Sequence, residues 1–132
     1  MKYLFDTCTC VFLIRNRSQA IQSRIESCEL GQIVVSSITE AELRYGADKS
    51  QDPPKNHGLL DRLLVALPVI DFGSKAAQSY GEVRSELERR GQVIGPLDML
   101  IAAHALSQNL EVITNNLSEF SRVPGLAASD WS

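Results

Sequence analysis

Short apolar runs alternate along the chain with longer stretches in which apolar residues recur every three or four positions. The short runs are too short for helices and end in polar or turn residues, so they predict strands at residues 3–5, 33–35, 69–70 and 112–113. The longer stretches predict amphipathic helices; one example has the apolar positions Ala76, Tyr80, Val83 and Leu87. Alternating strands and helices imply crossover connections, and therefore an α/β fold with a mainly parallel sheet.

One helix start follows the second strand. Ser37 and Glu40 have the spacing of a capping box, which predicts a helix from Ile38. Its apolar stripe would be Ile38, Ala41 and Tyr45, and Glu42 falls inside that stripe. A carboxylate on a buried face is costly unless it is paired or ligates a metal, so Glu42 is a candidate functional residue. Residues 50–58, which contain two adjacent prolines, predict a loop between two helices.

Another helix is predicted to open at Gly95-Pro96, with proline in its first position. Between Leu97 and Leu106 its only polar residues are Asp98 and His104, which is typical of a buried helix. Asp98 is then a first-turn carboxylate in apolar surroundings, where the helix N-terminus favours its charged form.

Length and composition indicate one globular domain, residues 1–132, that we expect to be cytoplasmic. No apolar run is long enough to span a membrane, and the N-terminus lacks the features of a signal peptide. The three cysteines are expected to be reduced thiols. A zinc site of Cys8 and Cys10 with His57 or His104 remains an alternative, although the spacing matches no zinc template. The net charge of −3 gives no basic footprint for nucleic acid, but the acids of a metal-dependent nuclease would themselves lower that balance.

Several acids follow predicted strands. In open α/β sheets, ligands bind beyond the carboxyl ends of the strands, where Asp6 directly follows the first strand. Asn116 and Glu119 follow the last strand, and Asp71 follows the third as a rival candidate. Clustered carboxylates repel one another, and Mg²⁺ or Mn²⁺, which prefer oxygen ligands, would offset that repulsion. Taken singly, these residues have simpler interpretations as a turn residue, an ion-pair partner, a helix-terminal charge or an N-cap.

Four stretches of the chain together resemble PIN-domain proteins, and specifically the VapC toxins of bacterial type II toxin–antitoxin modules. They are residues 4–7, residues 36–47, residues 94–105 and the closing segment from residue 112 to Trp131. The motifs occur in order over essentially the whole chain. The resemblance implies a PIN-like three-layer α/β/α fold with a mainly parallel sheet of four or five strands.

The resemblance also implies a function. It implies a Mg²⁺-dependent endoribonuclease that cuts structured RNA, with tRNA as the expected substrate, a VapB antitoxin as partner and usually a toxin homodimer. Asp6 and Asp98 match the two metal-binding acids, Glu42 matches the acid of the Ala-Glu-Leu motif, and Glu119 matches an acid before an aromatic residue. Thr7, Cys8 and Asn116 would support these groups. Asp71 matches no acid of the family.

One position departs from the family pattern, because Cys8 stands where these toxins usually have asparagine. The main alternative function is a catalytically inactive PIN-fold module that binds RNA or antitoxin. A phosphatase of the haloacid dehalogenase type is disfavoured, since Cys8 occupies the place of its second aspartate. An RNA-binding surface would draw on basic residues that could equally be solvated helix charges: Arg15, Arg17, Lys49, Lys55, Arg84, Arg89 and Arg90.

Overall fold

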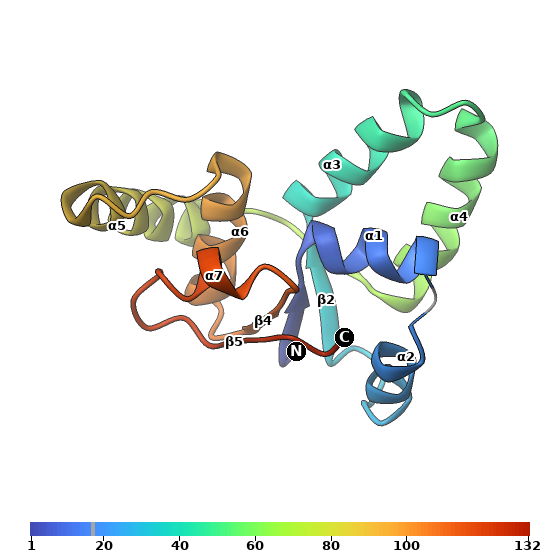
Figure 1. The fold of residues 1–132 in the computed structure, drawn as a ribbon, viewed down its shortest axis with the longest axis horizontal. Coiled ribbons are helices and arrows are strands. Elements are labelled where there is room, and N and C mark those ends of the chain that lie inside the picture. Colours follow the sequence, from blue (N-terminus) through green and yellow to red (C-terminus); the bar gives the residue numbers. More distant parts are fainter. Residues whose placement is uncertain (17) are drawn as a thin grey trace.

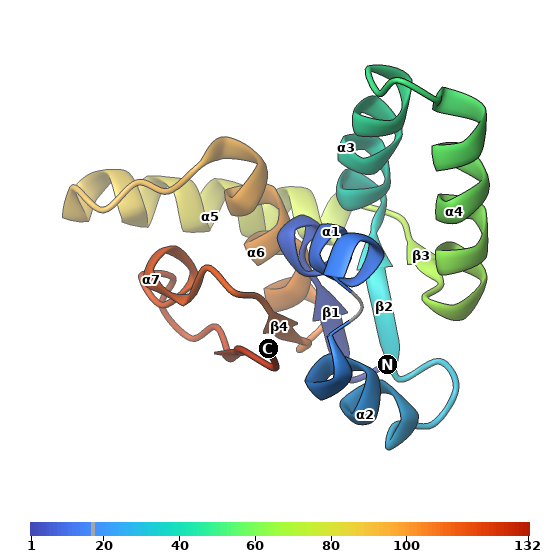
Figure 2. The ribbon, with the colours of Figure 1, turned by 45° about the vertical axis from the view of Figure 1, so that its right-hand side comes forward.

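The computed structural model describes residues 1–16 and 18–132, so Arg17 lies outside the described residues. Strands and helices alternate as the sequence predicts, and Figures 1 and 2 show the arrangement. The order is β1 (Tyr3–Phe5), α1 (Thr7–Asn16), α2 (Gln19–Glu26), β2 (Ile33–Ser36), α3 (Ser37–Asp48), α4 (Pro53–Ala66), β3 (Val69–Ile70), α5 (Ser74–Arg90), α6 (Pro96–Ser107), β4 (Glu111–Ile113), α7 (Leu117–Phe120) and β5 (Ala128–Ser129).

The strands form a five-stranded sheet in the order β3-β2-β1-β4-β5. All four pairings are parallel, which confirms the predicted sheet type. Leu4 of β1 pairs with Val34 on one side and with Val112 on the other, so β1 is central. The parallel strands place all their carboxyl ends at one edge of the sheet.

Helices cover both faces of the sheet, in agreement with the predicted three layers. Leu4, Val34 and Val112 point into a core shared with α5, α6 and α7. Phe5 and Val35, the next residues along their strands, point into a second core shared with α1, α2, α3 and α4. This alternation follows from the two-residue period of a strand. Figure 1 shows the two groups of helices on opposite sides of the sheet.

The C-terminal segment closes the second core. Trp131 is buried and meets the rings of Tyr3 and Phe5 edge to face, at centroid distances of 4.8 and 5.5 Å. Gly91 ends α5 with a φ of 65°, a left-handed conformation that glycine adopts without a Cβ clash. Among the described residues, no helix has the length and apolar character needed to cross a membrane.

The start and buried face of α3 differ from the sequence prediction. Ser36, not Ser37, caps the helix: its Oγ accepts a hydrogen bond from the Ile38 N–H at 3.1 Å. The buried residues are Thr39, Leu43 and Ala47, whereas the predicted stripe residues Ala41 and Tyr45 are exposed. The apolar pattern of α3 gives the wrong face because one buried position holds a polar residue, Thr39. The Thr39 hydroxyl lies 3.2 Å from the Thr7 hydroxyl.

The predicted loop of residues 50–58 is also wrong beyond its first three residues. Helix α4 begins at Pro53, and Asp52 caps it by accepting a hydrogen bond from the Lys55 N–H at 3.2 Å. Proline fits the first turn of a helix because the N–H it lacks has no intrahelical partner there. The adjacent prolines therefore open a helix, and only residues 49–52 connect α3 to α4.

Candidate active site

The site is built around Asp6, at the carboxyl end of the central strand. Its side chain is almost completely buried, with 1% of the residue exposed. Oδ1 accepts a hydrogen bond from the Thr9 N–H at 2.9 Å, and Oδ2 has no hydrogen-bond partner of adequate geometry. Burial raises the pKa of Asp6, and the nearby Thr114 hydroxyl and Thr9 partly oppose that shift. An orphaned, buried carboxylate oxygen is a strong candidate for a metal ligand.

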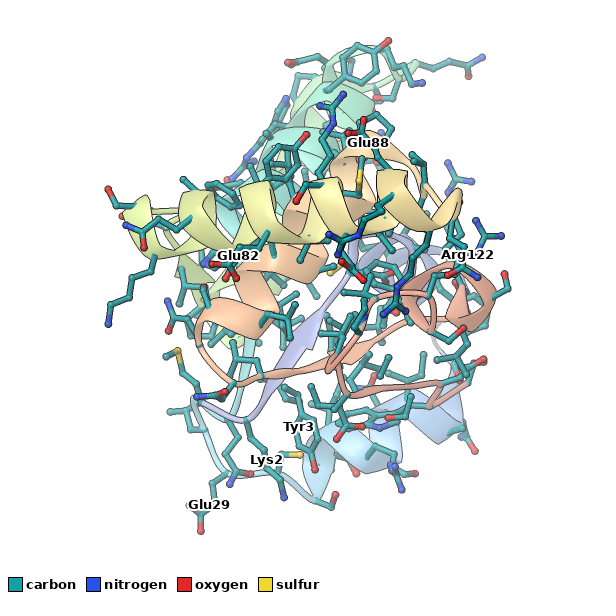
Figure 3. The ribbon with its side chains drawn as sticks, turned by 90° about the vertical axis from the view of Figure 1, so that its left-hand side faces the viewer. Lys2, Tyr3, Glu29, Glu82, Glu88 and Arg122 are labelled. Carbon is teal, nitrogen blue, oxygen red and sulfur yellow. The ribbon has the colours of Figure 1, made fainter. Side chains whose placement is uncertain are left out.

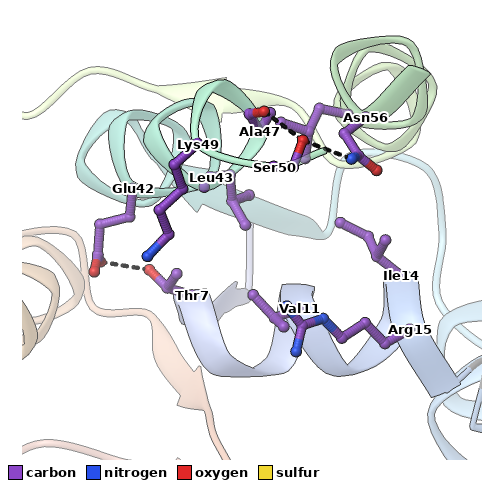
Figure 4. A pocket seen from close by; sticks show the side chains of 12 residues that line it. Thr7, Val11, Ile14, Arg15, Glu42, Leu43, Ala47, Lys49, Ser50 and Asn56 are labelled. Carbon is purple, nitrogen blue, oxygen red and sulfur yellow. Dashed lines mark hydrogen bonds between the residues drawn. The ribbon is translucent and has the colours of Figure 1, made fainter. Parts of the chain in front are cut away.

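Glu42 approaches the same edge from α3. The Thr7 hydroxyl donates a hydrogen bond to Glu42 Oε1 at 2.6 Å. Thr7 is the first residue of α1 and lies directly after Asp6, so this bond joins the α3 acid to the end of β1. Figure 4 shows the contact between the two side chains.

Asp98 and Glu119 form a second pair of acids at the site. Burial, followed by the hydrogen bond and negative charge of Glu119, raises the pKa of Asp98 to about 7; Asp6 and Glu42 add to the effect. The Asn116 amide donates a hydrogen bond to Glu119 Oε2 at 2.6 Å, which fixes that carboxylate. Asn116 stands at the N-cap position of α7, but its side chain makes this bond and does not cap the helix.

Cys8, on the first turn of α1, lies close enough to all four acids for their charges to act on its thiol. Burial raises the pKa of its thiol first, and the charges of Asp6, Asp98, Glu42 and Glu119 then raise it further. The residue as a whole is exposed, so the burial that acts on its thiol is partial. The structure therefore brings together the acids predicted from sequence, with Thr7, Cys8 and Asn116 beside them.

The residues of the rival sites lie elsewhere. Asp71 is exposed after β3, at the sheet margin. Cys10 is fully buried in the second core, and burial strongly raises its pKa. His57 bonds Asp48 at 2.7 Å, and His104 bonds Ser36 at 2.8 Å, so neither joins the cysteines. The zinc alternative is therefore wrong for the described residues.

The donor set fits a hard divalent cation. Over residues 1–16 and 18–132, no three His, Cys, Asp or Glu side chains lie close enough to form a complete metal cage. Mg²⁺ does not need one, because it usually keeps several waters and takes one or two carboxylates plus substrate phosphate oxygens. Asp6 Oδ2 and the Asp98 carboxylate would be such a pair at the sheet edge.

A groove of about 200 Å³ runs away from Glu42 between α1, α3 and α4. Figure 4 shows Thr7 and Glu42 at one end of the groove, with Ser50 and Asn56 at the other. Its walls are mostly apolar, and Arg15 and Lys49 are the basic residues that line it.

The basic candidates on α5 form ion pairs with acids of the same helix. On α5, Arg84 pairs with Glu88, and Arg89 and Arg90 pair with Glu86. Figure 3 looks onto this helix, whose Glu82 and Glu88 carry negative charge on the outer surface. These arginines are therefore solvated helix charges in ion pairs.

Sequence reasoning missed the hydroxyl groups and one acid around Asp6. Thr9 donates its hydroxyl to the Ile113 carbonyl at 2.9 Å, which ties α1 to β4, and Thr114 lies beside the Asp6 carboxylate. Asp130, after β5, raises the pKa of Asp6 through its charge. Their places in the sequence could have identified Thr114 and Asp130, because each residue follows a strand whose carboxyl end lies at this edge of the sheet.

Comparison with known proteins identifies the family to which the chain belongs. The family model described as PIN domain matches residues 3–126. The fold, the acidic site and this match establish that the chain belongs to the PIN-domain family, within which it groups with VapC proteins.

The similarity to VapC proteins extends over full length. The chain is 42% identical to a tRNA(fMet)-specific endonuclease VapC of Salmonella typhimurium, covering 99% of this chain and 98% of that protein. It is 41% identical to ribonuclease VapC2 of Rickettsia felis, with the same coverage. The crystal structure of DNA-bound VapBC from Salmonella typhimurium superposes with a TM-score of 0.96 at 42% identity, covering 100% of this chain and 99% of that one. The family resemblance and the fold class predicted from sequence are thereby confirmed.

Proposed function

We propose that this protein is the toxin of a VapBC-type toxin–antitoxin pair: an endoribonuclease, dependent on Mg²⁺, that hydrolyses RNA phosphodiester bonds and so inhibits translation. The observation that carries the proposal is the buried Asp6 at the carboxyl end of β1, whose Oδ2 has no partner among the described residues, with Glu42 joined to the adjoining Thr7 at 2.6 Å. The full-length likeness to proteins named tRNA(fMet)-specific endonuclease supports initiator tRNA as the substrate. The single PIN domain would span residues 1–132.

Asp6 and Asp98 would hold Mg²⁺, with Mn²⁺ able to substitute. When bound, such an ion activates water and stabilises negative charge on a phosphodiester. The ion would also favour the charged form of Asp98, whose pKa is about 7 without it.

The remaining acids would handle protons and orientation. Glu42 is fixed by Thr7 and Glu119 by Asn116, so each carboxylate has a defined direction at the site. In the proposed reaction they would accept the proton of the attacking water and return a proton to the departing 3′ oxygen. A phosphorus–oxygen bond to water forms, the bond to the 3′ oxygen breaks, and the product keeps a 5′-phosphate.

A VapB-type antitoxin is the proposed protein partner, and the toxin itself would form a homodimer. Solved relatives of this fold are VapBC complexes from Salmonella typhimurium and Rickettsia felis. The apolar groove between α1, α3 and α4 is the proposed binding site for an antitoxin segment. A basic antitoxin side chain near the four acids would compete with the metal ion.

The test is cleavage of purified initiator tRNA by the wild type with Mg²⁺, with elongator methionine tRNA as the matched substrate. Asp6→Asn and Asp98→Asn should each abolish cleavage while remaining folded, because each removes a metal ligand and one like charge. If the folded wild type cuts neither RNA with Mg²⁺ or Mn²⁺, the proposed endoribonuclease activity is rejected. Retained antitoxin binding in that case would support the inactive-module alternative.

A further inference from the structure

His104 is a buried histidine that the proposed chemistry does not use. It lies on α6, the helix that carries Asp98, and none of the residue is exposed. Its Nδ1 lies 2.8 Å from Ser36 Oγ. Ser36 is the cap of α3, the helix that carries Glu42. The contact therefore joins two helices that each bring an acid to the site.

The hydrogen bonds define a chain through Ser36. Its Oγ accepts from the Ile38 N–H at 3.1 Å, and we assign its own proton to a hydrogen bond donated to His104 Nδ1. Nδ1 is then the acceptor, and the imidazole is neutral with its proton on Nε2. Burial lowers the pKa of His104, while the backbone and charge of Asp71 act against that shift. Burial therefore favours the neutral imidazole, which is the form that can accept a hydrogen bond at Nδ1.

The Ser36–His104 pair does not have the features of a catalytic triad. A buried histidine that only filled space in the core would also be energetically costly. Ser36 is completely buried and serves as a helix cap, so its hydroxyl is not available as a nucleophile. His104 Nε2 has no hydrogen-bond partner of adequate geometry among the described residues, although the Asp71 backbone lies close by, and an apolar side chain would avoid the cost of burying this nitrogen. The Phe72 ring packs edge to face against the imidazole at 5.4 Å and holds its plane.

We infer that His104 is a positioning residue for the acidic site: its hydrogen bond to Ser36 sets the start of α3 against α6, and thereby the spacing of Glu42 from Asp98. This inference rests on the proposed function, because it concerns the same site. A shift of about an ångström between ligand-bearing elements is enough to weaken a metal site or a catalytic arrangement.

The experiment compares amides of two lengths at position 104. In His104→Asn the amide atoms occupy the place of Nδ1, and in His104→Gln they reach toward the place of Nε2. We expect the asparagine variant to bind Mn²⁺ within about twofold of the wild type in calorimetry. We expect His104→Gln and His104→Leu to bind it about fivefold or more weakly, as loss of an orienting partner does at metal sites.

Two further variants separate positioning from general loosening. Ser36→Ala removes the partner hydroxyl and should weaken Mn²⁺ binding like His104→Leu, and the double variant should be no weaker than either. Ser37→Ala is the matched control: it removes a neighbouring hydroxyl that accepts from the Phe72 N–H at 3.0 Å, and leaves the link to α6 intact. It should bind Mn²⁺ like the wild type.

Several outcomes would overturn the inference. It fails if His104→Leu binds Mn²⁺ like the wild type, if His104→Asn is as weak as His104→Gln, or if Ser37→Ala is as weak as Ser36→Ala. Should His104→Leu not fold, the comparison of the two amide variants still decides. Failure of the proposed function is distinguishable, because it appears in the wild type as absence of RNA cleavage; if the wild type binds no Mn²⁺, both proposals are rejected.

Discussion

Replacing Asp98 with asparagine should stabilise the metal-free protein while removing its activity. The folded protein raises the pKa of Asp98 from 3.8 to about 7 through burial, and then through Glu119, Asp6 and Glu42. Between those two values the folded state keeps a proton that the unfolded state releases. Stability therefore falls as pH rises through this window, and the full penalty is present above about pH 7.

The size of the penalty follows from the shift and from solvent exposure. A shift of about three units would correspond to ~4 kcal/mol if the group were fully shielded. Asp98 is only partly buried, so solvent screening reduces the estimate to about 1–2 kcal/mol. For a chain of this length, that corresponds to a gain of roughly 3–8 °C in melting temperature.

Thermal unfolding in EDTA at pH 8 and pH 5 measures the effect. Asp98→Asn should melt higher than the wild type at pH 8 and at nearly the same temperature at pH 5, where the wild-type carboxyl is already protonated. Glu82→Gln on the exposed surface of α5 is the matched control, because it removes the same charge far from the site. Addition of Mn²⁺ should raise the melting temperature of the wild type and of Glu82→Gln, but not that of Asp98→Asn.

An Asp98→Asn protein that gains no stability at pH 8 would refute the reasoning, as would a gain of equal size at both pH values. The first result would mean that burial and the neighbouring acids do not destabilise the charged form of Asp98 in the folded protein. The second would mean that the gain comes from packing or from helix propensity.

Two further predictions concern the residues around the acids. Cys8→Asn should keep or raise Mg²⁺-dependent cleavage and should reduce inhibition by Zn²⁺, because a thiol is a soft ligand and an amide is not; a tenfold loss of cleavage (about 1.4 kcal/mol) with unchanged Zn²⁺ sensitivity would contradict this. Arg15 lines the groove that begins at Glu42, and Arg15→Gln should raise KM for RNA and lower the salt dependence of binding by about one phosphate contact. Arg90 forms an ion pair on α5, and Arg90→Gln should leave both quantities unchanged. Equal effects of the two substitutions would exclude the groove as an RNA path.

Sequence periodicity predicted the architecture because the core residues follow it closely. In α5 the predicted positions Ala76, Val83 and Leu87 are buried, and each predicted strand exists. Strand β5 escaped prediction because it has two residues and no apolar pattern, so its pairing with β4 depends on long-range contacts. Secondary structure that depends on tertiary pairing leaves little local signal.

The acids of the site were predictable, but their supports were not. Asp6 and Asp98 stand out because a carboxylate next to an apolar run is unusual. The hydroxyls of Thr7, Thr39 and Ser36 look ordinary in sequence, and their roles appear only when α1, α3 and α6 come together. His104 was noticeable as a polar residue in an apolar helix, yet nothing local identified Ser36 as its partner.

The hydrogen-bond donors to the four acids also favour binding of a cation at this site. The donors to these carboxylates are neutral groups: the Thr9 N–H to Asp6, the Thr7 hydroxyl to Glu42 and the Asn116 amide to Glu119. None of the ion pairs found among the described residues includes one of the four acids. Positive charge must therefore come from a proton, which the raised pKa of Asp98 expresses, or from a bound cation that displaces it. Because the two compete, metal affinity should rise with pH up to about 7, with release of close to one proton per ion bound below that value, and should level off above it.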